Sequence, residues 1–251
     1  MANILVTGAG SGFGKGVALE LAQRGHAVTA ATFLPAEVDA MAAAHENISS
    51  MQLDVTSAAD VATVTDLPID VLVNNAGRGL MAPLTTVPLD EVRKTFEVNV
   101  FGMLAMCQAV IPGMKQRGSG RIINVSSIAG VLSGAMSAPY AMTKHAVEAL
   151  SVSLREELAP HGVDVTKINP GPYLTGFNDR MVDGIEQYID TGDAPAVEAR
   201  DFLKGVMENQ ADPDEIVQAI ANLAEADETP VETFLPEGIR AMLDAVLAER
   251  G

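Results

Sequence analysis

The sequence lacks several features that mark secreted and membrane-spanning proteins. It has a single cysteine, Cys107, so no internal disulfide can form, and its apolar surroundings (102–107) indicate a buried helix position rather than a nucleophile. No run of about eighteen or more apolar residues is present, which argues against a membrane span. The first seven residues have no basic region before their apolar run and read as a first strand. We therefore expect a cytoplasmic protein.

Basic residues are also scarce. The chain has 16 Lys and Arg against 33 Asp and Glu, giving a formal net charge of -17. Nucleic acids and anionic membranes require clustered basic residues, so neither is an expected partner. His145 and His161 have no cysteine or carboxylate partner at metal-ligand spacing, so no metal site is expected.

Short β-branched runs alternate with longer helical patterns along all 251 residues, 48% of which are hydrophobic. This alternation is typical of βαβ units and a parallel sheet. We expect a single domain, 1–251, with a doubly wound parallel sheet of about seven strands and helices on both faces. Strands are predicted at 3–7, 27–32, 49–53, 69–73, 120–126, 163–169 and 231–234. Helices are predicted at 12–24, 36–45, 57–64, 88–117, 137–160, 213–225 and 236–249.

One stretch, about 176–210, has weak periodicity because glycines and a proline interrupt its short apolar groups. It follows the end of a predicted strand. This position favours a mobile lid that covers the substrate site. The alternative is an ordinary surface insertion.

Three glycines, Gly8, Gly12 and Gly14, follow the strand at 4–6 and open the helix at 17–22. A chain that must turn tightly and approach a pyrophosphate at the positive end of a helix requires glycines in this order. The context predicts a Rossmann-type dinucleotide site. The alternative is a turn that binds nothing.

Three polar side chains are predicted to converge at the strand-end cleft. Tyr140 and Lys144 share one face of a helix that Ser137 could cap, and Ser127 closes the strand at 120–126. A phenol has an unperturbed pKa of about 10, but a nearby ammonium and a positive nicotinamide both lower that pKa. Tyr140 can then take a proton from an alcohol as hydride leaves, or return it in reduction.

The motifs Thr-Gly-x-x-x-Gly-x-Gly (7–14), Asn-Asn-Ala-Gly (74–77) and Ser-x12-Tyr-x3-Lys (127–144) resemble those of the short-chain dehydrogenase/reductase family, across most of the chain. The resemblance implies an NAD(P)-dependent oxidoreductase with Asn99, Ser127, Tyr140 and Lys144 as catalytic residues. In these roles Ser127 polarises the substrate oxygen, Lys144 holds the cofactor ribose, and Asn99 positions a water that relays protons to Lys144. The cofactor contacts expected are Gly8, Ser11, Gly12, Phe13, Gly14, Thr32, Asp54, Val55, Asn75, Ala76, Gly77, Tyr140, Lys144, Pro170, Gly171, Tyr173 and Thr175.

The choice between NAD and NADP departs from the usual pattern. Strand two ends at Thr32 and Phe33 without the acidic residue that holds the ribose of NAD or the arginine that holds the phosphate of NADP. A ribose diol without a carboxylate loses one hydrogen bond, whereas an unpaired phosphate leaves about two negative charges in an acidic protein. This comparison favours NAD, although Lys15 or a residue from elsewhere in the fold could reverse it.

The residues expected to flank the cleft are apolar and indicate a hydrophobic or aromatic alcohol or ketone. They are Leu80, Met81, Leu132, Met136, Tyr173, Phe177, Met181, Tyr188 and Phe202, with Ser127, Met136, Tyr140 and Phe177 as the expected substrate contacts. In members of the family the helices corresponding to 88–117 and 137–160 form a two-fold interface, which implies a homodimer or homotetramer; alternatively, both helices only cover the sheet.

The sequence leaves two other functions open. A dinucleotide-binding domain without catalysis could sense cofactor redox state or act as a scaffold, but loss of Tyr140 or Lys144 would favour that role and both are present. A non-redox lyase or epimerase on the same fold is the second alternative.

Overall fold

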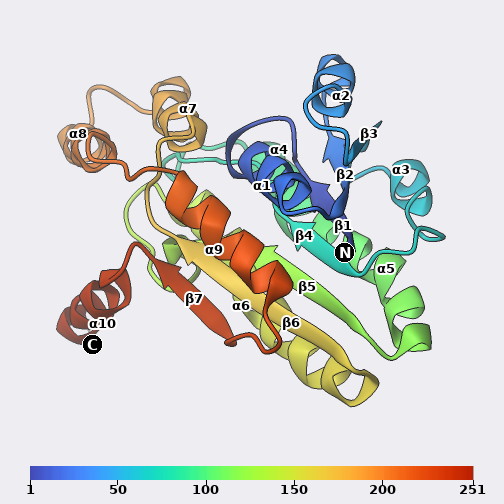
Figure 1. The fold of residues 1–251 in the computed structure, drawn as a ribbon. Coiled ribbons are helices and arrows are strands. Elements are labelled where there is room, and N and C mark those ends of the chain that lie inside the picture. Colours follow the sequence, from blue (N-terminus) through green and yellow to red (C-terminus); the bar gives the residue numbers. More distant parts are fainter. Residues whose placement is uncertain (251) are drawn as a thin grey trace.

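The structure, a computed structural model, describes residues 1–250, without the side chain of residue 250, and its centre is one seven-stranded parallel sheet (Figure 1). The strand order is β3-β2-β1-β4-β5-β6-β7. The strands are β1 (Asn3–Thr7), β2 (Ala27–Thr32), β3 (Ile48–Gln52), β4 (Val71–Asn74), β5 (Gly120–Val125), β6 (Val163–Pro170) and β7 (Glu232–Leu235). The order reverses between β1 and β4, which places a crevice at the carboxyl ends of these strands.

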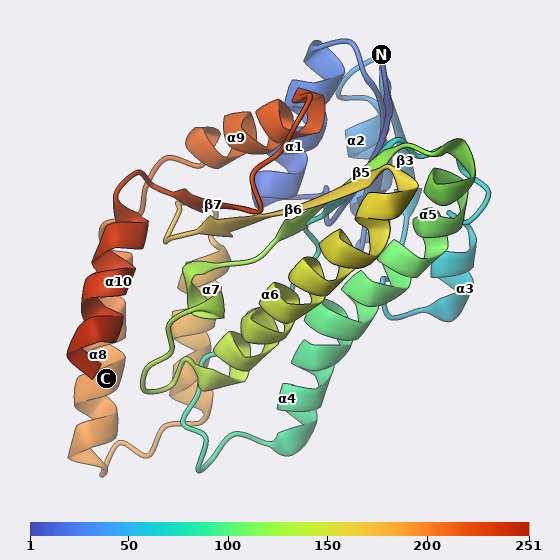
Figure 2. The same ribbon diagram turned by 90° about the horizontal axis from the view of Figure 1, so that it is seen from below.

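Helices cover both faces of the sheet, which confirms the predicted fold class. Seen edge-on, α1, α2 and α9 lie on one face, and α3 to α6 lie on the other (Figure 2). The helices are α1 (Gly12–Gln23), α2 (Pro35–Ala42), α3 (Ala58–Ala62), α4 (Leu89–Phe96), α5 (Met103–Arg117), α6 (Ala138–Leu158), α7 (Phe177–Asp183), α8 (Ala194–Met207), α9 (Asp214–Glu225) and α10 (Ile239–Arg250).

The apolar strands serve two separate cores. Ile4 and Val6 pack with α1 and α9, whereas Leu5 between them packs with Met106 and Val110 of α5. Successive strand residues point to opposite faces, so a strand covered on both sides must be apolar at every position. This requirement explains the continuous hydrophobic runs of the sequence.

The predicted helix at 88–117 is continuous, but its middle differs from the prediction. Residues Glu97–Gly102 form π-helical turns between α4 and α5, and Asn99 lies within them. The whole segment, Leu89–Arg117, is the one helix among the described residues that could cross a membrane by length and composition. Its buried residues, such as Met106 and Met114, pack against the sheet in the second core, as those of a sheet-covering helix do.

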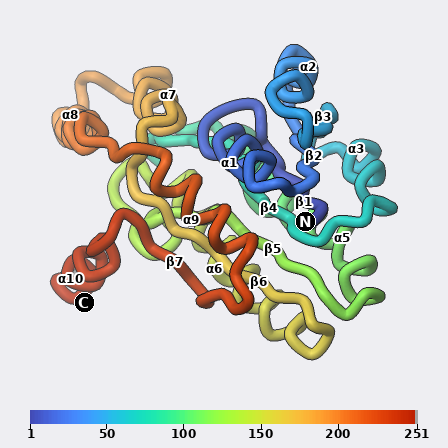
Figure 3. The backbone as a smooth tube through the Cα atoms, viewed as in Figure 1, coloured from blue at the N-terminus to red at the C-terminus, as the bar shows by residue number. Residues whose placement is uncertain are grey.

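The stretch at 176–210 contains helices that the periodicity did not reveal. After β6 the chain forms α7, a 3-10 turn (Gly184–Gln187) and α8 before it returns over the sheet as α9, as the tube trace shows (Figure 3). Met181 and Val182 of α7 pack in a third apolar cluster with Tyr140. No residue of α8 is fully buried, but Ala196, Ala199, Leu203 and Met207 pack against this cluster while partly exposed. The role of this stretch as a lid stays a prediction.

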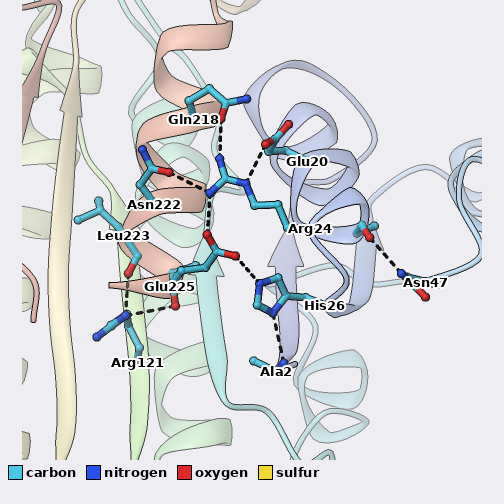
Figure 4. Close-up of polar contacts among 12 residues, drawn as sticks. Ala2, Glu20, Arg24, His26, Asn47, Arg121, Gln218, Asn222, Leu223 and Glu225 are labelled. Atoms are coloured by element: carbon cyan, nitrogen blue, oxygen red, sulfur yellow. Dashed lines mark hydrogen bonds and ion pairs between the residues drawn. The ribbon is translucent and has the colours of Figure 1, made fainter. Parts of the chain in front are cut away.

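A polar cluster fixes α1 against α9 (Figure 4). Arg24, just after α1, donates to the carboxylate of Glu225 on α9 at 2.7 Å, and the same carboxylate lies 2.8 Å from His26 Nε2. The helices approach so closely that a Cβ at Gly16 would lie 2.6 Å from the side chain of Val217. Because the glycine turn opens α1, this contact also fixes the position of the turn.

Candidate functional site

A cleft of about 710 Å³ lies at the carboxyl ends of the strands, within the range of roughly 300–1,000 Å³ typical of small-molecule and cofactor sites. It brings the glycine turn, the loops after β3, β4 and β6, and the end of β5 together. The predicted residues that line it are Gly8, Ser11, Gly12, Phe13, Asp54, Val55, Asn75, Ala76, Gly77, Ser127, Tyr140, Lys144, Pro170, Gly171, Thr175, Phe177 and Met181. Distant motifs of the sequence therefore form one site.

The glycine turn is packed tightly against the loop after β4. Gly8 has a positive φ of 65°, and a Cβ there would lie 2.8 Å from the Cα of Ala76. The side-chain amide of Asn75 donates to the carbonyl oxygens of Thr7 and Gly8 at 3.0 and 3.1 Å. Only glycine fits this arrangement, which leaves the backbone N–H groups at the start of α1 open toward the cleft.

Three residues predicted to contact the cofactor, Gly14, Thr32 and Tyr173, do not line the cleft. Thr32 is fully buried, and its hydroxyl donates to the carbonyl oxygen of Leu34 at 3.4 Å. Because Thr32 still belongs to β2, the residues that reach the cleft are the next two, Phe33 and Leu34. Gly14 also lies behind the cleft lining, where it supports the turn.

Tyr173 is a core residue rather than a cleft residue. Its ring meets Phe13 edge-on with centroids 5.6 Å apart, and its hydroxyl donates to Glu215 at 2.6 Å. Burial and the neighbouring Glu215 carboxylate raise the pKa of its phenol. Tyr173 follows Pro170 and Gly171 closely in the sequence, but the sequence does not indicate the direction of its side chain.

A carboxylate that the sequence interpretation missed, Glu37, lies at the glycine turn. A Cβ at Gly10 would come 1.9 Å from a carboxylate oxygen of Glu37, so this side chain covers Gly10 from the first turn of α2. The positively charged side chains among the described lining residues make their contacts away from Glu37. They are Lys144 beside Tyr140, Arg78 bound to Glu91, and Arg180 of α7 against Gly176. The only indication of this contact in the sequence is an acidic residue five positions beyond the end of β2.

Tyr140 and Lys144 meet Ser127 in the cleft, as their spacing predicts. The ammonium of Lys144 lies 5.6 Å from the centroid of the Tyr140 ring and donates to the carbonyl oxygen of Val125 at 2.8 Å. Both side chains are buried, at 7% and 4% exposure. The hydroxyl of Ser127 accepts from the backbone N–H of Ala129 at 3.1 Å, which leaves its own proton free to donate.

Burial changes the protonation of both groups in opposite directions. It raises the pKa of Tyr140, while a hydrogen bond with the Ser127 side chain opposes that change. It lowers the pKa of Lys144 to about 8, while the negative charge of Glu148 opposes that change. Near neutral pH the site therefore holds a neutral phenol beside a mostly charged ammonium.

Asn99 lies in the π-helical turns, fully buried next to the site. Its side-chain oxygen accepts from the backbone N–H of Arg78 at 2.7 Å. Its side-chain nitrogen donates to the carbonyl oxygen of Arg78 at 2.9 Å and to the hydroxyl of Thr143 at 3.0 Å. Both amide protons are thus used to join the loop after β4 to α6. Its role in holding a water stays a prediction.

The wall around Tyr140 is apolar. Phe177 lies 6.0 Å from Tyr140 between ring centroids, and Met181 lies so close to Gly79 that a Cβ there would meet it at 2.1 Å. Met136 packs against the same cluster behind the cleft lining. Phe202 is 70% exposed on α8 and takes no part in this wall.

Other candidate chemistry is not supported by the described residues. Cys107 is buried, as predicted, and burial raises the pKa of its thiol to about 12, so a thiolate nucleophile does not form near neutral pH. In residues 1–250 no three His, Cys, Asp or Glu side chains group in a way that could hold a metal ion.

Comparison with known proteins shows the family of the chain. Residues 2–185 match the family model described as short chain dehydrogenase. The chain is 37% identical over 185 residues to a 3-ketodihydrosphingosine reductase of Bacteroides thetaiotaomicron, which covers 70% of this chain. The match spans 65% of the length of that relative.

Solved structures show the same fold. An NAD+-bound xylitol dehydrogenase is 31% identical with a TM-score of 0.81, and the match covers 94% of this chain and 98% of the other. The closed form of a serine dehydrogenase complexed with NADP+ is 28% identical with a TM-score of 0.80, covering 93% and 94%. These structures support a nicotinamide dinucleotide as the cofactor class.

Proposed function

Since the chain belongs to the short-chain dehydrogenase family, we propose that it is an NAD-dependent oxidoreductase that interconverts a secondary alcohol and a ketone. The observation that carries the proposal is the burial of Tyr140 and Lys144 together with Ser127 in the cleft that the glycine turn opens. The cleft residues fit a dinucleotide, because the turn admits close backbone approach and Lys144 lies beside Tyr140.

A nicotinamide held in this cleft would supply or accept the hydride. In ketone reduction Tyr140 donates its phenolic proton to the carbonyl oxygen, and Ser127 donates a hydrogen bond that polarises the same oxygen. Lys144 has three donor protons, one of which goes to Val125, so two remain for the cofactor ribose and for stabilising the phenolate. Oxidation of the alcohol reverses the proton transfer.

The preference for NAD rests on Glu37. Its carboxylate covers Gly10, and Asp54 lines the same cleft, where it accepts from the backbone N–H and hydroxyl of Thr56. In the part of the chain that the structure describes, no hydrogen bond or ion pair occupies the Glu37 carboxylate. It is free to accept from a ribose hydroxyl and would repel a 2′-phosphate at this position.

The substrate is proposed to be apolar. Phe177, Met181 and Met81 form a hydrophobic cluster with Tyr140, and the relative named above acts, by its name, on a ketone. We propose that α7 and α8 act as the lid that closes this pocket from water.

The protein is proposed to be a single cytoplasmic domain.

A homodimer or homotetramer is proposed through α4, α5 and α6. Large apolar side chains are exposed here: Phe101, in the π-helical turns between α4 and α5, at 54%, and Met142 and Val152 of α6 at 40% and 41%. Such an apolar surface favours a protein contact. Sedimentation at several protein concentrations measures the assembly state.

The test compares the wild-type chain with Tyr140→Phe, using NADH and two apolar ketones, acetophenone and 2-decanone. Wild type is expected to reduce at least one ketone. Tyr140→Phe is expected to lose about 100-fold to 10,000-fold in rate and to bind NADH as tightly as wild type, as measured by nicotinamide fluorescence. Normal turnover by Tyr140→Phe would refute the proton-transfer role. Tight NADH binding by a wild type that reduces no ketone would favour the sensor or scaffold function instead.

A further inference from the structure

A largely buried charged cluster lies between the catalytic helix α6 and strands β5 and β6, and the mechanism above does not use it. Its centre is Glu148, one helical turn beyond Lys144 on α6. The ammonium of Lys167 on β6 lies 2.5 Å from one Glu148 oxygen. The other oxygen accepts from the side-chain amide of Asn169 at 2.6 Å and from the hydroxyl of Ser126. Glu148 therefore joins α6 to the ends of β5 and β6.

This cluster touches the backbone on both sides of the catalytic serine. Ser126 directly precedes Ser127, and the amide of Asn169 also donates to the carbonyl oxygen of Ser127 at 3.1 Å. After the serine the chain passes against the same carboxylate, since a Cβ at Gly130 would lie 2.8 Å from a Glu148 oxygen. Lys144 donates to Val125, one residue before Ser126. The segment 125–130 is thus held between Lys144 and Glu148.

We propose that Glu148 is a positioning residue that fixes the Ser127 loop and keeps the Lys144 ammonium charged inside the protein. This inference rests on the function proposed above. The charge effect follows from position: Glu148 is the negative group one turn from Lys144, and an opposite charge in a buried site favours the charged form.

The charges around Lys144 determine whether each substitution raises or lowers the pKa of Lys144. Lys167 faces Glu148 from β6 and partly cancels its effect on Lys144, while Glu232 on β7 lies 3.3 Å from Lys167 on its far side. Tyr140 is the other titratable group beside Lys144, and it stays a neutral phenol. Removal of the Glu148 charge should lower the pKa of Lys144, and removal of the Lys167 charge should raise it.

The test measures the pH dependence of NADH binding and of kcat/KM for reduction of whichever ketone wild type accepts. Glu148→Gln keeps an oxygen that accepts from Asn169 and Ser126 but removes the charge. It should move the alkaline limb of both profiles about one pH unit lower. Lys167→Met should move the limb higher. Glu148→Asp retains the charge on a shorter side chain and should lower kcat while the limb stays in place.

Glu232→Gln is the matched control, because it removes a carboxylate from the same lysine without touching the Ser127 loop. Its limb should move by less than about a third of the Glu148→Gln shift. Limbs that stay in place for both Glu148→Gln and Lys167→Met, or that move in the same direction, would overturn the inference. If Glu148→Gln does not fold, the direction of the Lys167→Met shift decides. A wild type that neither binds NADH nor reduces a ketone would instead overturn the proposed function.

Discussion

The Cβ position of Gly14 points at the carbonyl oxygen of Gly8, only 2.3 Å away, and lies 2.4 Å from the side-chain nitrogen of Asn75. No heavy atom fits there unless the glycine turn opens. The glycine that lies behind the cleft thus determines the shape of the surface that would meet a pyrophosphate.

Gly14→Val should therefore abolish NADH binding, with a loss of at least about 100-fold in affinity, since both the turn and the start of α1 must shift. Nicotinamide fluorescence measures the affinity, and circular dichroism shows whether the sheet and helices persist. Gly205→Ala is the control, because no atom lies within 4 Å of a Cβ at that position. Unchanged affinity in Gly14→Val would show that the pocket is misplaced.

Ketone reduction should slow above about pH 8. Burial lowers the pKa of Lys144 to about 8, so the ammonium is present below that pH and is lost as the pH rises through it. Without that charge, the phenolate that forms on Tyr140 during proton donation is no longer stabilised. The measurement is kcat/KM against pH between about 6 and 10. Lys144→Arg keeps its charge throughout this range, so any activity it retains should show no such limb; an identical limb in this variant would assign the titration to another group.

Glu37 should determine the cofactor preference. Glu37→Arg replaces a free carboxylate over Gly10 with a cation, so NADPH affinity should rise and NADH affinity should fall, changing their ratio by about 100-fold or more. Titration of both cofactors measures the ratio. Asp39→Asn, on the exposed side of the same helix, removes one charge without touching the cleft and should leave the ratio near its wild-type value. An unchanged ratio in Glu37→Arg would remove Glu37 from cofactor recognition.

The features that the sequence predicts well are those in which chain order alone fixes position. Strand ends of a parallel sheet meet at one edge, so Ser127 and the Asn-Asn-Ala-Gly segment had to come together once the strands were identified. Tyr140 joins them from the first turn of the helix that follows β5. Side-chain direction is different. Thr32 and Tyr173 lie next to cleft residues in sequence but point into the core. Successive side chains of a strand point to opposite faces, so Thr32 can be buried while Phe33 lines the cleft. Tyr173 lies in the loop after β6, where chain order does not determine side-chain direction.

Contacts between distant segments were the least predictable. Glu37 reaches Gly10 only because α2 begins directly after β2, and Glu148 meets Lys167 only where α6 crosses β6. Neither residue belongs to a motif with fixed spacing. The helices α7 and α8 were missed because Gly184, Gly192 and Gly205 interrupt the segment and the apolar groups between them are short.

The cluster between α1 and α9 should contribute measurably to stability. The Arg24 side chain is 21% exposed, and its guanidinium donates to Glu20, Asn222, Gln218 and Glu225 at once, so it loses little further freedom for each bond. Arg24→Ala should lower the free energy of unfolding by about 1–2 kcal/mol, because it breaks several charge-assisted hydrogen bonds. Urea unfolding followed by circular dichroism measures the change. The matched control is Arg93→Ala, since Arg93 and its partner Asp90 are 65% and 78% exposed and solvent screens such a pair almost completely. Equal losses in both variants would mean that the cluster acts as an ordinary surface ion pair, and α1 would then be held against the sheet by its apolar face alone.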